Sequence, residues 1–290
     1  MPDSDGSDTS AIDIDALQAW LGRQETRTDV ISPTPLAGLS ATLDYAVARA
    51  GAGDRLPEGW HWLYFLPMPP AAAIDVDGHA RRGNFLPAVP LPRRMWAGSR
   101  IHFLSELRVG DEIRRVSSIS DISHKHGASG ELVFVGVRHR IFCTDRLAIE
   151  EEQQLVYRGH SVPGASSPAR PAPAQPQWSR ELRPDPVLLF RYSALTFNSH
   201  RIHYDLDYAI SGEGYPGLVV QGPLTATLLL DLVHRELPGK QLETFQFSAV
   251  RPAFAGEPLL LQGRCDGPAI RLWALDGAGA LVMDARAQLR

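Results

Sequence analysis

Two histidines and an asparagine lie close together in the chain, at Asn198, His200 and His203. An imidazole titrates near neutral pH and can therefore take up or release a proton during a reaction. A glycine-bearing segment, residues 214–222, follows and leads directly into an apolar run after Gly222. Because the first turn of a helix leaves backbone N–H groups free, this combination predicts an acid–base group beside donors that stabilise a developing oxyanion.

The histidine pair has two other interpretations. The i, i+3 spacing of His200 and His203 places both side chains on one face only if this turn is helical, and otherwise both are ordinary polar loop residues. With Asp205 the pair would offer three metal ligands. Arg201 places a positive charge between the histidines, however, and no third histidine lies nearby. We therefore expect no metal.

The elements that hold these residues follow from the periodicity of apolar side chains. Residues 34–49 and 223–236 have helical spacing, and the second of these is apolar nearly all round, which predicts a buried helix. A shorter helix is expected at 13–22 and a strand-like run at 60–66. Further strands are expected at residues 99–107, 111–122, 131–143 and 150–158. The motif around His203 is expected where a strand ends and a helix begins.

A proline- and alanine-rich segment at residues 161–178 is typical of a linker. It separates an N-terminal domain, 13–160, from a C-terminal domain, 179–290, and the polar start of the chain, 1–12, is predicted to be disordered.

The two halves share a sequence layout in which a long helix precedes a strand, a glycine–acidic turn and further strands. Gly110 and Gly256 hold equivalent positions in that turn. This layout predicts a duplicated α+β unit, with a helix lying on one face of an antiparallel sheet.

Bulk composition excludes several classes of protein. The chain has 290 residues and a net charge of -4, which argues against an electrostatic grip on nucleic acid. It has no apolar run of about 18 residues, so we expect no membrane span. Two cysteines cannot build a disulfide framework. The acidic N-terminus is unlike a signal peptide, and a cytoplasmic location is expected.

The run from Arg191 to Leu230 resembles the hydratase motif of the MaoC-like, R-specific enoyl-thioester hydratases, which have the hot dog fold. His203 matches the catalytic histidine of that family, Asp205 the acidic residue after it, and Gly222 the glycine at the start of the central helix. Three positions depart from the pattern: the catalytic aspartate is Asn198, the asparagine is His200 and the proline is Arg201.

This variant resembles a subgroup that includes mesaconyl-C4-CoA hydratase, itaconyl-CoA hydratase and the mitochondrial type 2 3-hydroxyacyl-thioester dehydratase. Segments of the first half, among them LPEGWHWLYF and PLPRRMWAGSRIHF, are similar to that subgroup as well. The resemblance implies two fused hot dog domains with the catalytic motif only in the second, an acyl-CoA substrate, no separate cofactor, and either a single chain or a homodimer.

The resemblance and the residue chemistry together assign roles. His203 is the expected general base, and Asn198, which cannot titrate, holds the attacking water. The expected oxyanion and substrate contacts are Gly222, Gln221, Arg201, Tyr192 and His200. The expected contacts to CoA or to a substrate carboxylate are Arg191, Arg93 and Arg94, because a guanidinium binds both oxygens of an anion. An alternative for Arg201 is that it faces solvent or a phosphate of CoA.

The predicted reaction is the reversible hydration of an enoyl-CoA, with itaconyl-CoA or mesaconyl-C4-CoA giving citramalyl-CoA as the preferred case. The alternatives are a 3-hydroxyacyl-thioester dehydratase of fatty-acid synthesis, a hot dog thioesterase, and an acyl-CoA-binding protein that lost catalysis when the aspartate became Asn198.

Overall fold

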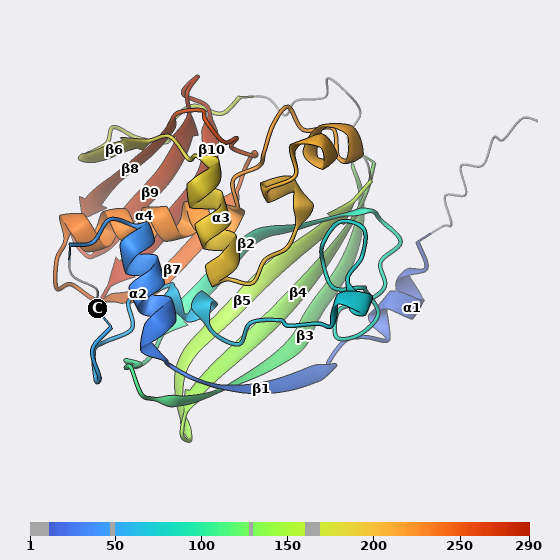
Figure 1. The fold of residues 1–290 in the computed structure, drawn as a ribbon, viewed down its shortest axis with the longest axis horizontal. Helices are drawn as coiled ribbons and strands as arrows, with labels where there is room; N and C mark the ends of the chain where they lie inside the picture. Colours follow the sequence, from blue (N-terminus) through green and yellow to red (C-terminus); the bar gives the residue numbers. More distant parts are fainter. Residues whose placement is uncertain (1–11, 47–49, 128–129, 160–168) are drawn as a thin grey trace, which may run out of the picture.

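The computed structural model describes residues 12–46, 50–127, 130–159 and 169–290. Within them, ten strands form one antiparallel sheet in the order β1-β3-β4-β5-β2-β7-β10-β9-β8-β6 (Figure 1). The strands of the first half are β1 (Gln24–Val30), β2 (Arg93–Phe103), β3 (Glu112–Gly127), β4 (Gly130–Cys143) and β5 (Arg146–Arg158). Those of the second half are β6 (Trp178–Leu182), β7 (Leu242–Ala249), β8 (Leu259–Asp266), β9 (Ala269–Asp276) and β10 (Leu281–Leu289).

This strand order is a palindrome about the central pair β2 and β7. Moving outward, β5 corresponds to β10, β4 to β9, β3 to β8 and β1 to β6. Gly110 and Gly256 occupy equivalent turns, with φ of 103° and 82°. The Gly110 N–H donates to the Ile31 carbonyl, and the Gly256 N–H donates to the Pro184 carbonyl. Each acceptor lies just before a helix, so the two halves repeat the same strand and helix arrangement.

The helices of the two halves correspond differently from the sequence prediction. By position, α2 (Pro33–Thr42) corresponds to α3 (Pro186–Leu195), and Figure 1 shows them side by side in front of the sheet. The long helix α4 (Gly222–Glu236) precedes β7 and has no helical counterpart among the described residues before β2. The pairing of residues 34–49 with 223–236 was therefore wrong.

The first half has an irregular segment where the second half has α4. Between α2 and β2 the described residues form two short 3₁₀ helices, η1 (Trp60–Leu63) and η2 (Ala71–Ala73), so the strand predicted at 60–66 was wrong. Helix α2 also ends earlier than predicted, because Leu43 leaves the helical region and Asp44 has a φ of 58°. A short α1 (Ile14–Gln18) and the four predicted strands are present with shifted ends.

Helix α4 lies across the strands of the second half and is buried on nearly every side, as predicted (Figure 1). Its buried Asp231 accepts hydrogen bonds from the Tyr45 hydroxyl at 2.6 Å and from Arg180 and Arg235 at 2.7 and 2.8 Å. Because Tyr45 belongs to the first half, this carboxylate joins α4 to both halves.

The described part of the predicted linker, residues 169–177, runs along the sheet. The Leu281 N–H donates to the Arg170 carbonyl at 2.7 Å, and Ala172 and Ala174 pack against the cluster around Trp273. Strand β6 then starts at Trp178. The remainder of the predicted linker and residues 1–11 of the predicted disordered start lie outside the described residues.

Candidate active site

The motif around His203 follows a helix rather than a strand. Helix α3 ends at Leu195, and Phe197 takes a φ of 48°, which turns the chain back. The Asn198 N–H then donates to the Ser193 carbonyl at 2.8 Å, and its side-chain oxygen accepts from the His200 N–H at 3.1 Å. The 3₁₀ turn η3 (Arg201–His203) completes the segment. Asn198 therefore shapes the turn that presents both histidines.

His203 is buried and lines a cavity. Its Nδ1–H donates to the Val219 carbonyl at 2.7 Å, which leaves the lone pair of the neutral imidazole on Nε2. Burial and the neighbouring His200 lower the pKa of His203 to about 3. The imidazole is therefore neutral at physiological pH and can accept a proton.

The start of α4 lies at the same cavity. The Gln221 amide donates to the Leu189 carbonyl at 3.0 Å and to the Ser193 hydroxyl at 2.9 Å, which anchors the helix start against α3. Gly222 opens the helix, and a Cβ placed there would meet only the Trp96 carbonyl, at 3.7 Å. Its N–H has no partner within the helix, so it is available to an oxyanion.

His200 is held by the Glu213 carboxylate, which no sequence pattern indicates as a site residue. Its Nε2–H donates to Glu213 at 3.0 Å, and Glu213 also pairs with Arg93 at 3.2 Å. Burial opposes ionisation of Glu213, but the bonds and charges of His200 and Arg93 outweigh it and lower the carboxyl pKa. Glu213 thus stays charged beside the histidines.

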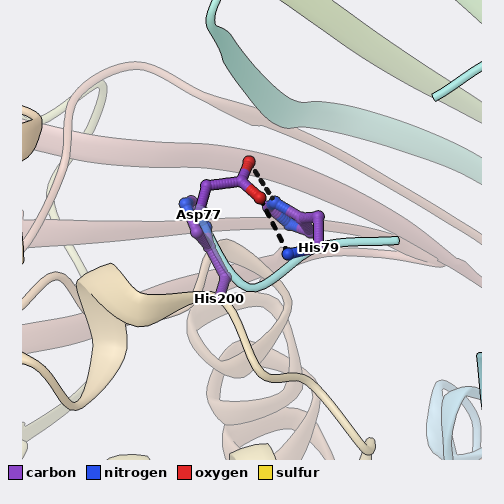
Figure 2. Close-up of side chains that lie close together, drawn as sticks. All are labelled: Asp77, His79 and His200. Carbon is purple, nitrogen blue, oxygen red and sulfur yellow. Dashed lines mark hydrogen bonds and ion pairs between the residues drawn. The ribbon is translucent and has the colours of Figure 1, made fainter. Parts of the chain in front are cut away.

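A loop of the first half reaches the motif of the second half. Asp77 and His79 come from this loop and His200 from the motif (Figure 2). His79 Nδ1 lies 3.0 Å from the Asp77 carboxylate, and the His79 and His200 rings are 4.0 Å apart. At Gly78, where φ is 89°, an added Cβ would lie 1.9 Å from the Ser199 carbonyl. Only glycine allows so close a contact.

These three residues also form the one metal-compatible group among the described residues. The ligand atoms of Asp77, His79 and His200 lie within 4.8 Å of one another. This differs from the set considered from the sequence, which used Asp205. Asp77 binds His79 and Glu213 binds His200, so each histidine already has a ring nitrogen bonded to a carboxylate.

The cavity has a volume of about 1010 Å³ and reaches into both halves. At one end it is lined by His203 and Gly222. At the other its wall is the face of β3, β4 and β5, the counterpart of the sheet face that α4 covers in the second half. Glu151 is buried there, and it accepts from Ser99 at 2.6 Å and contacts His61 Nε2 at 3.0 Å.

The predicted substrate contacts fall into two groups. Tyr192, Gln221, Gly222, His200 and Arg94 line the cavity together with Asn198 and His203. Arg201 instead pairs with Asp205 at 2.7 Å and lies over the Tyr208 ring. Arg93 is buried against Glu213, and Arg191 is exposed on α3. These three arginines do not line the cavity. Tyr192 donates to or accepts from Thr227 at 3.3 Å, and burial raises its pKa.

Comparison with known proteins shows the family to which the chain belongs. The family model of hydroxyacyl-thioester dehydratase type 2 matches residues 59–255. The chain is 45% identical to mesaconyl-C(4)-CoA hydratase of Chloroflexus aurantiacus, over 93% of this chain and 97% of the relative. It is 27% identical to the mitochondrial hydroxyacyl-thioester dehydratase type 2 of Schizosaccharomyces pombe, over 84% and 90%.

Solved structures resemble the fold at low sequence identity. A MaoC-like dehydratase of Phytophthora capsici superposes with a TM-score of 0.68 at 13% identity, covering 96% of this chain and 98% of that one. A Mycobacterium tuberculosis protein described as a double hotdog fold gives 0.57 at 14%, covering 93% and 96%. The α+β double hot dog fold is confirmed. The chain belongs to the hydroxyacyl-thioester dehydratase type 2 family, as the MaoC-like motif indicated.

No helix in the described part of the chain is long and apolar enough to cross a membrane.

Proposed function

We propose that this protein catalyses the reversible hydration of an enoyl-CoA, with a C5 dicarboxylyl-CoA as substrate. The observation that carries the proposal is the neutral His203, whose Nε2 faces the same cavity as the free N–H at the start of α4. A base and an oxyanion site in one cavity are the two requirements for adding water to an α,β-unsaturated thioester.

In the hydration direction, the oxygen of water forms a bond to the β-carbon while His203 Nε2 takes one water proton. The electron pair of the double bond moves toward the thioester oxygen, where the Gly222 N–H stabilises the negative charge. His203 then returns its proton to the α-carbon and becomes neutral again. Asn198 cannot titrate, so within the motif His203 alone carries the proton.

The substrate class is supported by the 45% identical mesaconyl-C(4)-CoA hydratase and by Arg94. Arg94 lines the cavity, and it forms no ion pair with a carboxylate among the residues that the structure describes. Its charge is one of the causes that lower the pKa of His79, whose ring neighbours that of His200. A guanidinium there can bind the free carboxylate of a C5 diacid. Arg94→Ala should lower kcat/KM more for mesaconyl-C4-CoA than for neutral crotonyl-CoA.

A second candidate is the dehydration of 3-hydroxyacyl thioesters, which is the same chemistry in reverse. It is favoured by the family to which the chain belongs. A non-catalytic acyl-CoA binder is disfavoured, because it leaves the paired base and oxyanion donor without a role. A thioesterase would also use a base and an oxyanion site, but thioesterases of this fold typically place a carboxylate in the site, whereas the candidate base here is His203.

The test is to incubate the purified protein with itaconyl-CoA, mesaconyl-C4-CoA and crotonyl-CoA in parallel, and to follow absorbance of the enoyl thioester and the product masses. Rapid gain of 18 mass units on the C5 acids alone supports the proposal. Preference for crotonyl-CoA favours the dehydratase of fatty-acid type. Release of free CoA without hydration, or saturable binding without turnover, contradicts a hydratase.

A further inference from the structure

The loop that carries His79 is fixed against the hydratase motif at several points. The Ser199 hydroxyl donates to the Gly78 carbonyl at 2.6 Å, and the Arg201 N–H donates to the Asp77 carbonyl at 2.9 Å. The Arg201 guanidinium also donates to the Val76 carbonyl at 3.1 Å. A loop with so many backbone contacts to the motif holds its side chains in a defined position beside the site.

His79 has one ring nitrogen bound and one free. The Nδ1–H donates to the Asp77 carboxylate, because a carboxylate accepts and does not donate at neutral pH. This fixes the neutral tautomer with its lone pair on Nε2. Among the described residues Nε2 has no hydrogen-bond partner, and the side chain lines the cavity with 23% of its surface exposed.

His79 and His203 therefore present the same chemistry to one cavity. Each imidazole has its Nδ1–H bound to an oxygen and its Nε2 lone pair unoccupied. Both rings neighbour the His200 ring, whose centroid is 4.0 Å from that of His79 and 5.4 Å from that of His203. Burial, the Arg94 charge and His200 lower the pKa of His79 to about 4. His79 is consequently a neutral hydrogen-bond acceptor at physiological pH.

We propose that His79, oriented by Asp77, binds the attacking water as a second acceptor in addition to His203. Water has two hydrogens: His203 removes one, and His79 Nε2 accepts a hydrogen bond from the other, which remains on the oxygen that joins the β-carbon. No additional proton is transferred. The oxygen lone pair is directed at the β-carbon by two fixed acceptors, and such orientation lowers the barrier of the addition step. This proposal rests on the proposed hydratase function.

The alternative for the same residues is a metal site. A metal at Asp77, His79 and His200 would displace the hydrogen bonds of His79 to Asp77 and of His200 to Glu213. The two carboxylates accept the histidine N–H groups in the arrangement observed, so we favour the water-binding role. The experiment below also tests for a bound metal.

The test compares His79→Ala, His79→Gln, Asp77→Asn and the control Val76→Ala, in the full-length enzyme with its best enoyl-CoA. Val76 belongs to the same loop, but its side chain is 76% exposed. His79→Ala should lower kcat about 100-fold, the scale of a lost orienting contact. The affinity for unreactive butyryl-CoA should stay within about threefold, because binding of the acyl chain does not use the water.

Two readouts separate this role from a structural one. Added imidazole should raise the rate of the His79→Ala variant at least about tenfold, since a free acceptor can occupy the vacated space. His79→Gln, which keeps an acceptor oxygen, should retain more activity than His79→Ala. Asp77→Asn should lower kcat while its melting temperature stays close to that of wild type, because an amide partner no longer enforces one tautomer.

Several results would overturn the proposal. One is His79→Ala activity within about fivefold of wild type; another is an equal loss in Val76→Ala. A third is a stoichiometric metal in the purified enzyme whose removal by chelator abolishes activity, which would assign the group to a metal. If wild type hydrates no enoyl-CoA, the proposed function itself fails. If the wild-type enzyme is a hydratase and the His79→Ala variant remains active, only the role of His79 as second acceptor is rejected and the proposed function stands.

Discussion

The two halves of this molecule share five strands and one helix in the same order, yet only the second half has the long helix α4. In the second half α4 covers the sheet and its first turn offers Gly222 to the cavity. In the first half the face of β3, β4 and β5 is left to line the cavity. The first half thus leaves room for a substrate where the second half has a helix, and the N-terminus of that helix is the proposed oxyanion site.

The halves also use buried histidine differently. His203 has its Nε2 free toward the cavity, whereas His61 of the first half has its Nε2 bonded to Glu151. The lone pair of neutral His61 is then on Nδ1, which is buried and has no hydrogen-bond partner among the described residues, so a substrate in the cavity does not reach it. Proton transfer is therefore expected from His203 of the second half and not from His61.

Replacing these two histidines gives the sharpest contrast. His203→Ala should lower kcat by about 10² to 10⁴, the usual contribution of a positioned acid–base group. His61→Gln should keep kcat within about tenfold and act mainly on stability. Steady-state kinetics of both variants measure the difference. A His203→Ala enzyme within tenfold of wild type would remove the assignment of the base.

Gly78→Ala should separate the loop of the first half from the motif of the second. The added Cβ collides with the Ser199 carbonyl, so the loop has to move and His79 with it. We expect kcat/KM to fall about 100-fold. Gly83→Ala is the control, because Gly83 has the same left-handed φ of 90° but its Cβ would meet only Ala88, at 3.7 Å. Equal rates for the two variants would contradict the role of the loop.

Asp231→Ala should weaken the connection between α4 and both halves. Its buried carboxylate accepts from Tyr45, Arg180 and Arg235, and loss of charged hydrogen bonds of this kind costs about 2–3 kcal/mol. Urea unfolding measures the change in the free energy of unfolding. Arg264→Ala, which breaks the surface pair with Asp266, should change the free energy of unfolding far less. Similar losses in both variants would show that α4 does not depend on Asp231.

The stability of the protein is also expected to depend on pH. Burial is the first cause that lowers the pKa of His79 and His139 to about 4 and that of His203 to about 3. Between pH 6.5 and 4 the unfolded chain binds protons at these positions and the native protein does not, so stability falls as pH falls. Each histidine contributes at most about 1.4 kcal/mol per pH unit.

Urea unfolding at pH 7.0 and 5.5 measures this slope. His139→Gln should reduce it, because His139 lies on β4, away from the reacting groups. A free energy of unfolding that is unchanged between these two pH values would mean that the three histidines are protonated in the native state.

Local patterns in the sequence predict helix α4, the strands of the first half, and a site that contains both His203 and Gly222. Each depends on apolar periodicity or on a compact motif. The equivalence of α2 with α3 was not predicted. The residues of α3 lie next to the motif around His203, and the resemblance of that segment to the hydratases says nothing about a helix there. The aromatic run at Trp60 was mistaken for a strand, although tertiary packing folds it into a 3₁₀ turn.

No local sequence pattern predicts that His79 and Glu213 lie at the candidate site. His79 meets His200 across a separation of more than one hundred residues, and only the folded chain brings them together. The one local signal was the Asp77-Gly78 pair, which is typical of a tight turn. Similarly, the sequence does not distinguish Arg201 from Arg94 as a possible cavity residue. In the structure Arg201 pairs with Asp205 and does not line the cavity, whereas Arg94 does.

The sheet is continuous through the pairing of β2 with β7, in which Gly98 lies opposite Ser248 and His102 opposite Thr244. Cutting the chain between its halves would expose an unpaired strand edge on each fragment, and such edges recruit other chains. The two halves are thus expected to need co-expression, and a fragment made alone should aggregate even though its strand layout is complete. The pairing of β2 with β7 also joins residues that are far apart in the sequence. Because such long-range contacts form slowly, refolding should be slow for a chain of this size.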